Sequence, residues 1–257
     1  MARRNPSARF GREKKDVTHT TGDGGMSTGG RADLPRRILD VAVSVFLAFV
    51  TLPIVALALV GSAVALRAWP LFTQERVGRD GTVFQFMKVR TLPTSVPAYV
   101  DKFQLAEHHI PRFCRLLRSL HLDELPQLYL VVIGRMSVVG PRPEMAYLHE
   151  QMPHAFAARR TTVRPGCTGL WQVSECSNGL IGSAPEFDSF YLTHRTCRLD
   201  LWVLYRTALM MSGLAGPVRL SRVPAWALAG DDGETTTIDL RDPAPESSMA
   251  AVLMTGR

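Results

Sequence analysis

The 257-residue sequence has few cysteines, and they follow no pattern typical of a bridged or metal-binding protein. No Cys-x-x-Cys pair occurs, and with the seven histidines they form no recognisable zinc motif. The spacing therefore argues against a disulfide framework and indicates reduced thiols in a cytosol-facing protein. The four cysteines are Cys114, Cys167, Cys176 and Cys197.

Acidic residues are also in the minority, with 23 Asp and Glu against 30 Lys and Arg and a formal net charge of +7. Such an excess is typical of proteins that bind nucleic acids, membrane surfaces or phosphorylated substrates. The sequence shows no basic patch interleaved with aromatic residues and no known DNA-reading helix, so we expect no nucleic-acid partner.

Charge is absent from residues 41–66, a run of 26 residues in which apolar side chains predominate. About 20 such residues suffice to cross a bilayer, whereas the apolar core of a signal peptide has about 7 to 15. A spanning helix and a re-entrant hairpin both remain open. Pro53 in mid-segment favours a bend. Arginines on both flanks draw both ends to the cytoplasmic side: Arg31, Arg36, Arg37, Arg67, Arg76 and Arg79.

Composition divides the whole chain into four parts. Residues 1–34 are rich in Gly, Ser, Thr and Arg and predict a disordered basic arm, which suits a membrane surface better than a nucleic acid. Residues 35–70 form the membrane-embedded part, and residues 71–218 form a globular domain. The polar stretch 219–257 predicts a flexible tail. The fold class expected is α+β and mostly helical.

Two short strands are expected at residues 74–77 and 83–87, joined by a turn at Arg79-Asp80-Gly81. Lys88 and Arg90 follow on one strand face. Taken alone, these two cations fit a solvated sheet edge better than a binding role.

Apolar residues from Ile110 to Leu120 have helical spacing, and Arg112, Arg115 and Arg118 form a basic stripe. The pattern fits a helix at a membrane interface or an ordinary surface helix. The acid pair Asp123-Glu124 and Pro126 come next; they suit either the first turn of a helix over residues 125–133 or an active site. Helical spacing is expected again over residues 187–211.

Five strings in order resemble the bacterial sugar transferase family, the monotopic polyprenyl-phosphate sugar-1-phosphate transferases: QERVG, KVRT, LDELPQL, GRMSVVGPRPEM and RPGCTGLWQV. The resemblance covers residues 35–212. It implies a re-entrant membrane helix bent at Pro53 and a small cytoplasmic catalytic domain with a β-hairpin and interfacial amphipathic helices. It also places the chain at the inner membrane, facing the cytoplasm.

The resemblance implies transfer of a sugar-1-phosphate from a nucleoside diphosphate sugar, usually a UDP-sugar, to polyprenyl (undecaprenyl) phosphate, with release of UMP. The reaction begins synthesis of an exopolysaccharide or another surface glycan. It proceeds through a covalent phospho-sugar on Asp123, with Mg²⁺ bound by Asp123 and Glu124. Arg118, Lys88, Arg90 and Arg142 match phosphate-binding positions, and Gln172 matches a substrate-binding position.

The sequence departs from the family pattern at four places. His121 replaces a small residue, Tyr129-Leu130 an aromatic-Asn pair, Arg135 an acid, and Ser174-Glu175-Cys176 an Asn-Gly-Arg. The last change leaves the sugar and the base undetermined. An alternative is a catalytically degenerate membrane scaffold of a glycan assembly complex, against which the intact acid pair argues. The sequence gives no oligomeric state and leaves a homodimer open.

Overall fold

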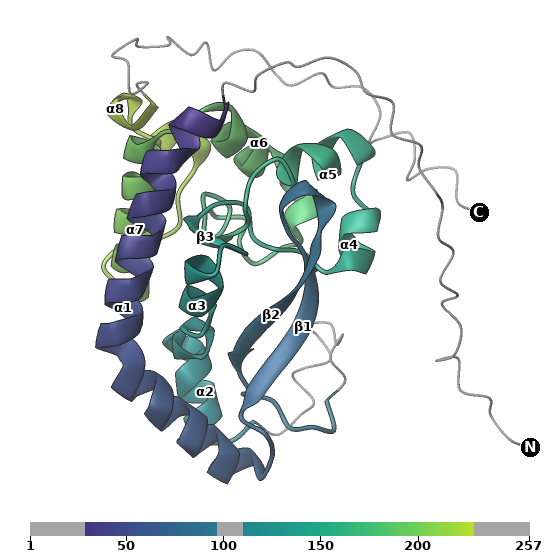
Figure 1. The fold of residues 1–257 in the computed structure, drawn as a ribbon, viewed down its shortest axis with the longest axis vertical. Helices are drawn as coiled ribbons and strands as arrows, with labels where there is room; N and C mark the ends of the chain where they lie inside the picture. The colour runs from purple at the N-terminus through teal and green to yellow at the C-terminus, as the bar shows by residue number, and fades with distance from the viewer. Residues whose placement is uncertain (1–28, 97–109, 229–257) are drawn as a thin grey trace, which may run out of the picture.

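The computed structural model describes residues 29–96 and 110–228, and the predicted arm up to residue 28 lies outside them. Helices predominate and the strands form two small two-stranded sheets, which confirms the mixed, mostly helical class (Figure 1). The longer elements are α1 (Gly29–Leu66), β1 (Leu71–Val77), β2 (Val83–Val89), α2 (Arg112–Ser119), α3 (Gln127–Val132), β3 (Ser137–Val139), α4 (Ala146–Glu150), α5 (His154–Arg160), β4 (Gly166–Thr168), α6 (Pro185–Thr193), α7 (Cys197–Met211) and α8 (Ala225–Leu228).

Helix α1 contains, among the described residues, the one stretch long and apolar enough to cross a membrane, Arg36–Leu66. It continues through Pro53 but changes direction part-way along (Figure 1). Pro53 has no amide hydrogen to give, and the Thr51 hydroxyl donates to the Leu47 carbonyl at 2.7 Å; both features bend helices. The structure thus contains one continuous helix with a bend in this stretch. That both ends lie on one side of a membrane stays a prediction.

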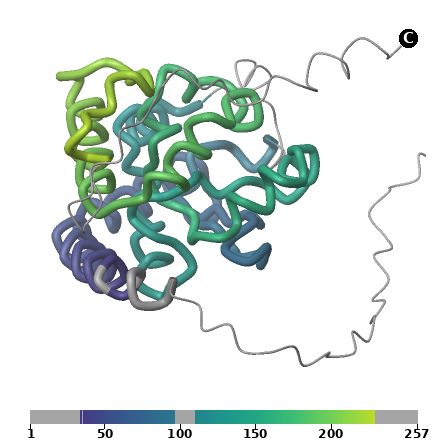
Figure 2. Tube along the Cα trace, turned by 90° about the horizontal axis from the view of Figure 1, so that it is seen from above, coloured from purple at the N-terminus to yellow at the C-terminus, as the bar shows by residue number. Residues whose placement is uncertain are grey.

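Helix α1 lies along one edge of the domain (Figures 1 and 2), and polar side chains fasten it there. The Asp40 carboxylate accepts from the Val138 amide at 3.0 Å, and Arg36 lies 3.6 Å from the Asp200 carboxylate. Arg37 donates to three carbonyls at and beyond the end of α3, those of Val131 (2.7 Å), Val132 (3.1 Å) and Met136 (3.4 Å). The Val132 carbonyl is the last of α3, and a helix end leaves such a carbonyl without an intrahelical partner.

Strands β1 and β2 pair antiparallel from Leu71↔Val89 to Val77↔Val83, and a short turn over Arg79–Gly81 joins them. Both Asp80 (φ 56°) and Gly81 (φ 72°) adopt left-handed backbone there, a conformation that these two residue types tolerate. The predicted hairpin is confirmed and is longer by a few residues at its open end.

The acid pair lies in a 3₁₀ turn, Leu122–Glu124, that precedes α3. The acids therefore precede α3, which starts at Gln127 after Pro126, and lie outside its first turn. His121 enters the turn with φ 54° and separates it from α2. A small cluster of Ala58, Val89 and Leu117 packs α1, β2 and α2 together beside the turn.

The loop that follows β3 and the loop that leads into the parallel strand β4 meet back to back. The Gly140 amide donates to the Thr168 carbonyl, and the Gly166 amide donates to the Pro141 carbonyl, both at 2.9 Å. A Cβ on Gly166 would overlap the backbone of Gly140. Glycine at this contact lets the Gly-Pro-Arg-Pro loop and the Arg-Pro-Gly-Cys loop touch through their backbones.

The predicted helical stretch 187–211 is two helices, α6 and α7, with a break at His194–Thr196. The Thr196 hydroxyl caps α7 by accepting from the Leu199 amide at 3.0 Å. Folded elements continue to Leu228, ten residues into the segment assigned to a flexible tail, and Ala227 is fully buried. The remainder of that segment lies outside the described residues.

Candidate functional site

Asp123 is buried, with 5% of its surface exposed, and it has a charged environment. Burial raises the pKa of its carboxyl, and Glu124 raises it further, while Lys88 and Arg118 act in the opposite direction. Burial alone would raise the pKa of Glu124 as well, but Arg142, at 3.3 Å, and Lys88 outweigh it and the pKa is lowered. The surroundings therefore shift the two pKa values in opposite directions, that of Asp123 upward and that of Glu124 downward.

Lys88 is half-buried on β2, and burial lowers the pKa of its amine against the opposing effect of Asp123 and Glu124. The structure thus excludes a fully solvated sheet edge for this side chain. Lys88 and Arg90 share a strand face as predicted, because both lie over the ring of Phe72, at 5.5 and 5.6 Å.

The predicted cations divide into two groups. Lys88, Arg118 and Arg142 act on the acid pair. Arg90 instead donates to the carbonyl of Trp69 at 2.9 Å, and its own carbonyl accepts from the Ser62 hydroxyl of α1. Arg90 therefore joins the end of β2 to the chain just after α1.

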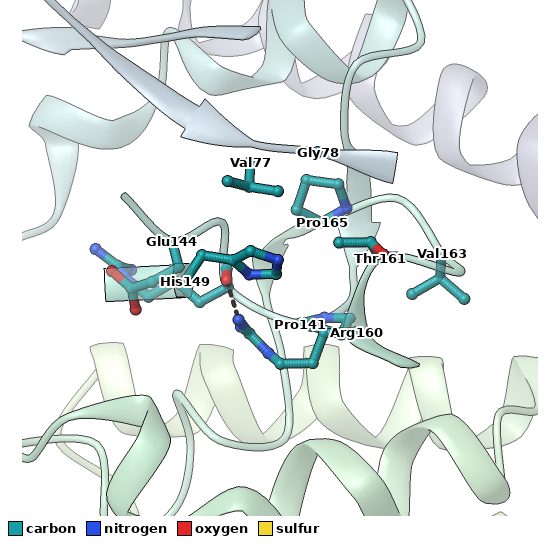
Figure 3. Close-up of a pocket in the computed structure, with 10 residues that line it drawn as sticks. Val77, Gly78, Pro141, Glu144, His149, Arg160, Thr161, Val163 and Pro165 are labelled. Atoms are coloured by element: carbon teal, nitrogen blue, oxygen red, sulfur yellow. Dashed lines mark hydrogen bonds between the residues drawn. The ribbon is translucent and has the colours of Figure 1, made fainter. Parts of the chain in front are cut away.

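A buried ion pair holds the loop that carries Arg142. Arg160 of α5 donates to the Asp188 carboxylate at 2.8 Å and to the Arg142 carbonyl at 2.7 Å. The side chains of the pair are only 5% and 2% exposed. Figure 3 shows Arg160 beside Pro141 and Glu144 around a void of about 10 Å³, the limit for a single water and far too small for a substrate.

Tyr191 completes the support behind this loop. Its hydroxyl donates to the Asp200 carboxylate at 2.7 Å and lies 3.3 Å from the Val139 carbonyl. Asp188 and Tyr191, which match an Asp-x-x-Tyr of the resembled family, are therefore positioning residues and do not face a substrate cavity among the described residues.

A larger cavity of about 360 Å³ opens next to the acid pair, a size within the usual range for small-molecule sites. Glu124, Arg142 and Gln172 line it, so the structure brings these three predicted residues together. Asp123 is not among the lining residues. The other lining residues come from the segment after α2, from α3, from the 167–173 loop and from α7: Ser119, His121, Leu125, Gln127, Leu128, Cys167, Thr168, Val173, Thr207, Met210 and Met211.

Sequence reasoning assigned no role to the α7 residues of this lining or to Gln127. Thr207, Met210 and Met211 lie three and four residues apart, which puts them on one helix face. This spacing is visible in the sequence, but a helix that packs its apolar face against a hydrophobic core has the same spacing. Gln127 belongs to the LDELPQL string, but the sequence around it does not predict that this glutamine lines a cavity.

One departure from the family pattern, His121, lies at a position with left-handed backbone. Its φ of 54° lies in the left-handed region, where a residue without a large side chain is least strained. Ser174 and Glu175, by contrast, make local contacts: the buried Ser174 hydroxyl donates to the Trp171 carbonyl at 2.7 Å, and Glu175 pairs with Arg219 at 2.9 Å. Residues 174–176 do not line the large cavity.

Comparison with known proteins agrees with this arrangement. The family model for bacterial sugar transferases matches residues 31–213. The chain belongs to the bacterial sugar transferase family. The matched region contains α1, the hairpin, the acid pair and the cavity.

Three relatives illustrate the range of the family. A UDP-glucose:undecaprenyl-phosphate glucose-1-phosphate transferase of Caulobacter vibrioides is 35% identical over 68% of this chain and 68% of its own length. A UDP-galactose-lipid carrier transferase of Erwinia amylovora is 34% identical over 54% of this chain and 32% of its own. An undecaprenyl-phosphate galactose phosphotransferase of Salmonella typhimurium is 32% identical, with the same coverage as the second. The chain thus spans about a third of the length of some relatives that it matches.

Proposed function

We propose that this protein transfers a sugar-1-phosphate from a UDP-sugar to undecaprenyl phosphate and so initiates synthesis of a surface glycan. The observation that carries the proposal is the acid pair of buried Asp123 and half-buried Glu124. Lys88, Arg118 and Arg142 surround the pair, which lies beside a cavity in a bacterial sugar transferase fold. The names of the relatives support a UDP-sugar donor and an undecaprenyl phosphate acceptor.

Asp123 is the proposed nucleophile. One carboxylate oxygen attacks the phosphorus that carries the sugar, the bond from that phosphorus to the bridging oxygen breaks, and UMP leaves. An oxygen of the lipid phosphate then attacks the same phosphorus and displaces the carboxylate, which is regenerated. The raised pKa of Asp123 makes the carboxylate a stronger base, while Lys88 and Arg118 favour its ionised form.

The cations have separate tasks in this scheme. Arg142 and Lys88 flank Glu124, so they are suited to the negative charge of a diphosphate bound in front of it. Arg118 hydrogen-bonds the Thr91 hydroxyl at 3.4 Å, a long contact that leaves most of its donors for a phosphate. Arg90 is engaged with Trp69 and is the weakest candidate of the four.

The two carboxylates also suit Mg²⁺. Within residues 29–96 and 110–228, no group of three or more His, Cys, Asp or Glu gathers to hold a metal alone. This fits an ion that usually takes one or two carboxylates and completes its shell with substrate phosphates and water. Asp123 and Glu124 would hold it, and when bound it supplies charge neutralisation at the diphosphate.

The exposed surface of α1 supports membrane association and, with it, access to a lipid acceptor. Large apolar side chains on the outer face of α1 are more than 60% exposed, among them Phe46, Phe49, Leu52, Leu57, Val60 and Val64. On α2, Leu116 and Leu120 are about half exposed beside the exposed Arg112 and Arg115. This mixture suits a membrane interface better than an ordinary surface helix. We place the protein at the cytoplasmic face of the inner membrane, with α1 re-entrant.

The test is UMP release by the full chain in detergent with Mg²⁺, undecaprenyl phosphate and a panel of UDP-sugars. We expect release with at least one sugar, abolished in Asp123→Asn and strongly reduced in Glu124→Gln. Asp80→Asn is the matched control, because Asp80 lies in the exposed hairpin turn. No release by the wild type with any sugar would favour the scaffold alternative.

A further inference from the structure

Two glutamine side chains in the large cavity have amide atoms that are buried without a partner. Gln127 is 2% exposed, and its Nε2 has no hydrogen bond among the described residues. Gln172 has neither its Nε2 nor its Oε1 bonded within that same part of the chain. Buried polar atoms in folded proteins nearly always have partners, so two such amides at one cavity indicate that a bound molecule supplies them.

The character of the cavity restricts what that molecule is. Glu124 and Arg142 line it and already pair with each other at 3.3 Å, and His121 is the other basic side chain of the lining. The hydroxyls of Thr168 and Thr207 bond each other at 2.8 Å, and burial raises the pKa of Cys167 to about 12, so that thiol stays neutral. Beyond the ion pair, the surroundings of the two amides thus suit a neutral group with many hydrogen-bonding atoms. They do not suit a second phosphate.

We propose that this cavity, between α3, α7 and the 167–173 loop, binds the sugar of the donor, and that Gln127 and Gln172 hydrogen-bond its hydroxyl or acetamido groups. The inference rests on the proposed function. The sugar is one oxygen away from the phosphorus that Asp123 attacks, whereas the uracil lies beyond a second phosphate and a ribose. Glu124, the next residue after the nucleophile, lines the cavity, so the nearest uncharged part of the donor is the sugar.

The assignment makes the two glutamines determinants of sugar specificity. A neutral amide that bonds a sugar hydroxyl discriminates between epimers, since the wrong epimer leaves the amide unpaired again. Residues 174–176, where the family pattern is altered, line no part of this cavity and would leave the choice of sugar to the lining residues.

The experiment compares UMP release from UDP-glucose, UDP-galactose and their N-acetyl derivatives by the wild type, Gln127→Met and Gln172→Met. Methionine keeps the length of the side chain and removes the hydrogen bonds. Gln85→Met is the control, because Gln85 lies exposed on the hairpin. Inhibition by UMP reports the nucleotide site, and thermal unfolding midpoints verify folding.

We expect each cavity variant to lower kcat/KM for the best donor about threefold to tenfold and to change the ratio between donors, with the UMP inhibition constant within about twofold. Weaker UMP inhibition at an unchanged sugar ratio would mean that the amides bind the nucleotide, and the proposal would be wrong. An unchanged ratio with unchanged inhibition would refute it as well. No release by the wild type is the distinct outcome that overturns the proposed function itself.

Discussion

The buried pair of Arg160 and Asp188 allows a sharp test of how the Arg142 loop is held. Removing one partner of such a pair leaves a buried charge without compensation and costs about 3–5 kcal/mol. The Arg160 and Asp188 side chains are 5% and 2% exposed and lie 2.8 Å apart, so this is a buried pair to which that cost applies. Arg160→Met also loses the bond to the Arg142 carbonyl, worth about 1 kcal/mol.

The two single variants differ in their response to pH. Burial already raises the pKa of Asp188 against the opposing effect of Arg160. In Arg160→Met the pKa rises further, so the folded state binds more protons than the unfolded state and stability falls as pH rises. Asp188→Asn removes the group with the raised pKa and leaves a guanidinium that stays charged, so the cost of this change does not rise with pH. Arg160→Met should therefore lose less stability at pH 5 than at pH 8, whereas the loss in Asp188→Asn should be no larger at pH 8 than at pH 5.

The assay is denaturant unfolding of the full chain in detergent, followed by the fluorescence of the buried Trp171 and Trp202. The double variant Arg160→Met with Asp188→Leu completes a cycle and should cost clearly less than the sum of the single changes. Additive costs below about 1 kcal/mol, with no pH difference between the single variants, would refute the reasoning.

Three further predictions use matched controls. Ser62→Ala should lower stability by about 1 kcal/mol in thermal unfolding, because a buried hydrogen bond of the hydroxyl is lost. Its control is Ser44→Ala, which should be neutral or stabilising because the buried Ser44 hydroxyl has no partner among the described residues. Gly166→Ala should cost about 1–3 kcal/mol because its Cβ meets backbone, and Gly216→Ala, with open space around it, should stay within about 0.5 kcal/mol. Burial raises the pKa of Asp200 to about 6, so this group lowers stability as pH rises from about 4 to 6; melting curves of Asp200→Asn should lack that decline.

Local patterns explain which parts of the fold could be predicted. The hairpin follows from alternating residues around an Asp-Gly turn, and α2 follows from a stripe of apolar residues. The grouping of Lys88, Arg118 and Arg142 around the acids was predicted from resemblance to a family, since nothing in their spacing places them together.

Contacts between distant segments explain what could not be predicted. The 3₁₀ turn at the acids depends on His121 adopting a left-handed backbone, which its residue type does not require. The cavity is lined by residues of α3 and α7, which are about 80 residues apart in the sequence. Hydrophobic periodicity predicts each helix but not the contact between them. The helix expected over residues 187–211 is interrupted before α7, where the Thr196 side chain accepts a hydrogen bond from the Leu199 amide and so caps a new helix.

The attachment of α1 through Arg37 has a consequence for the order of events on the ribosome. The carbonyl that Arg37 binds at Val131 lies 94 residues further along the chain. At translation rates of about 5–20 residues per second, that acceptor is synthesised roughly 5 to 20 seconds after the arginine. Helix α1 is therefore synthesised in full, and available to a membrane, before the carbonyls that Arg37 binds exist. The polar end of α1 obtains these partners only when the domain is completed.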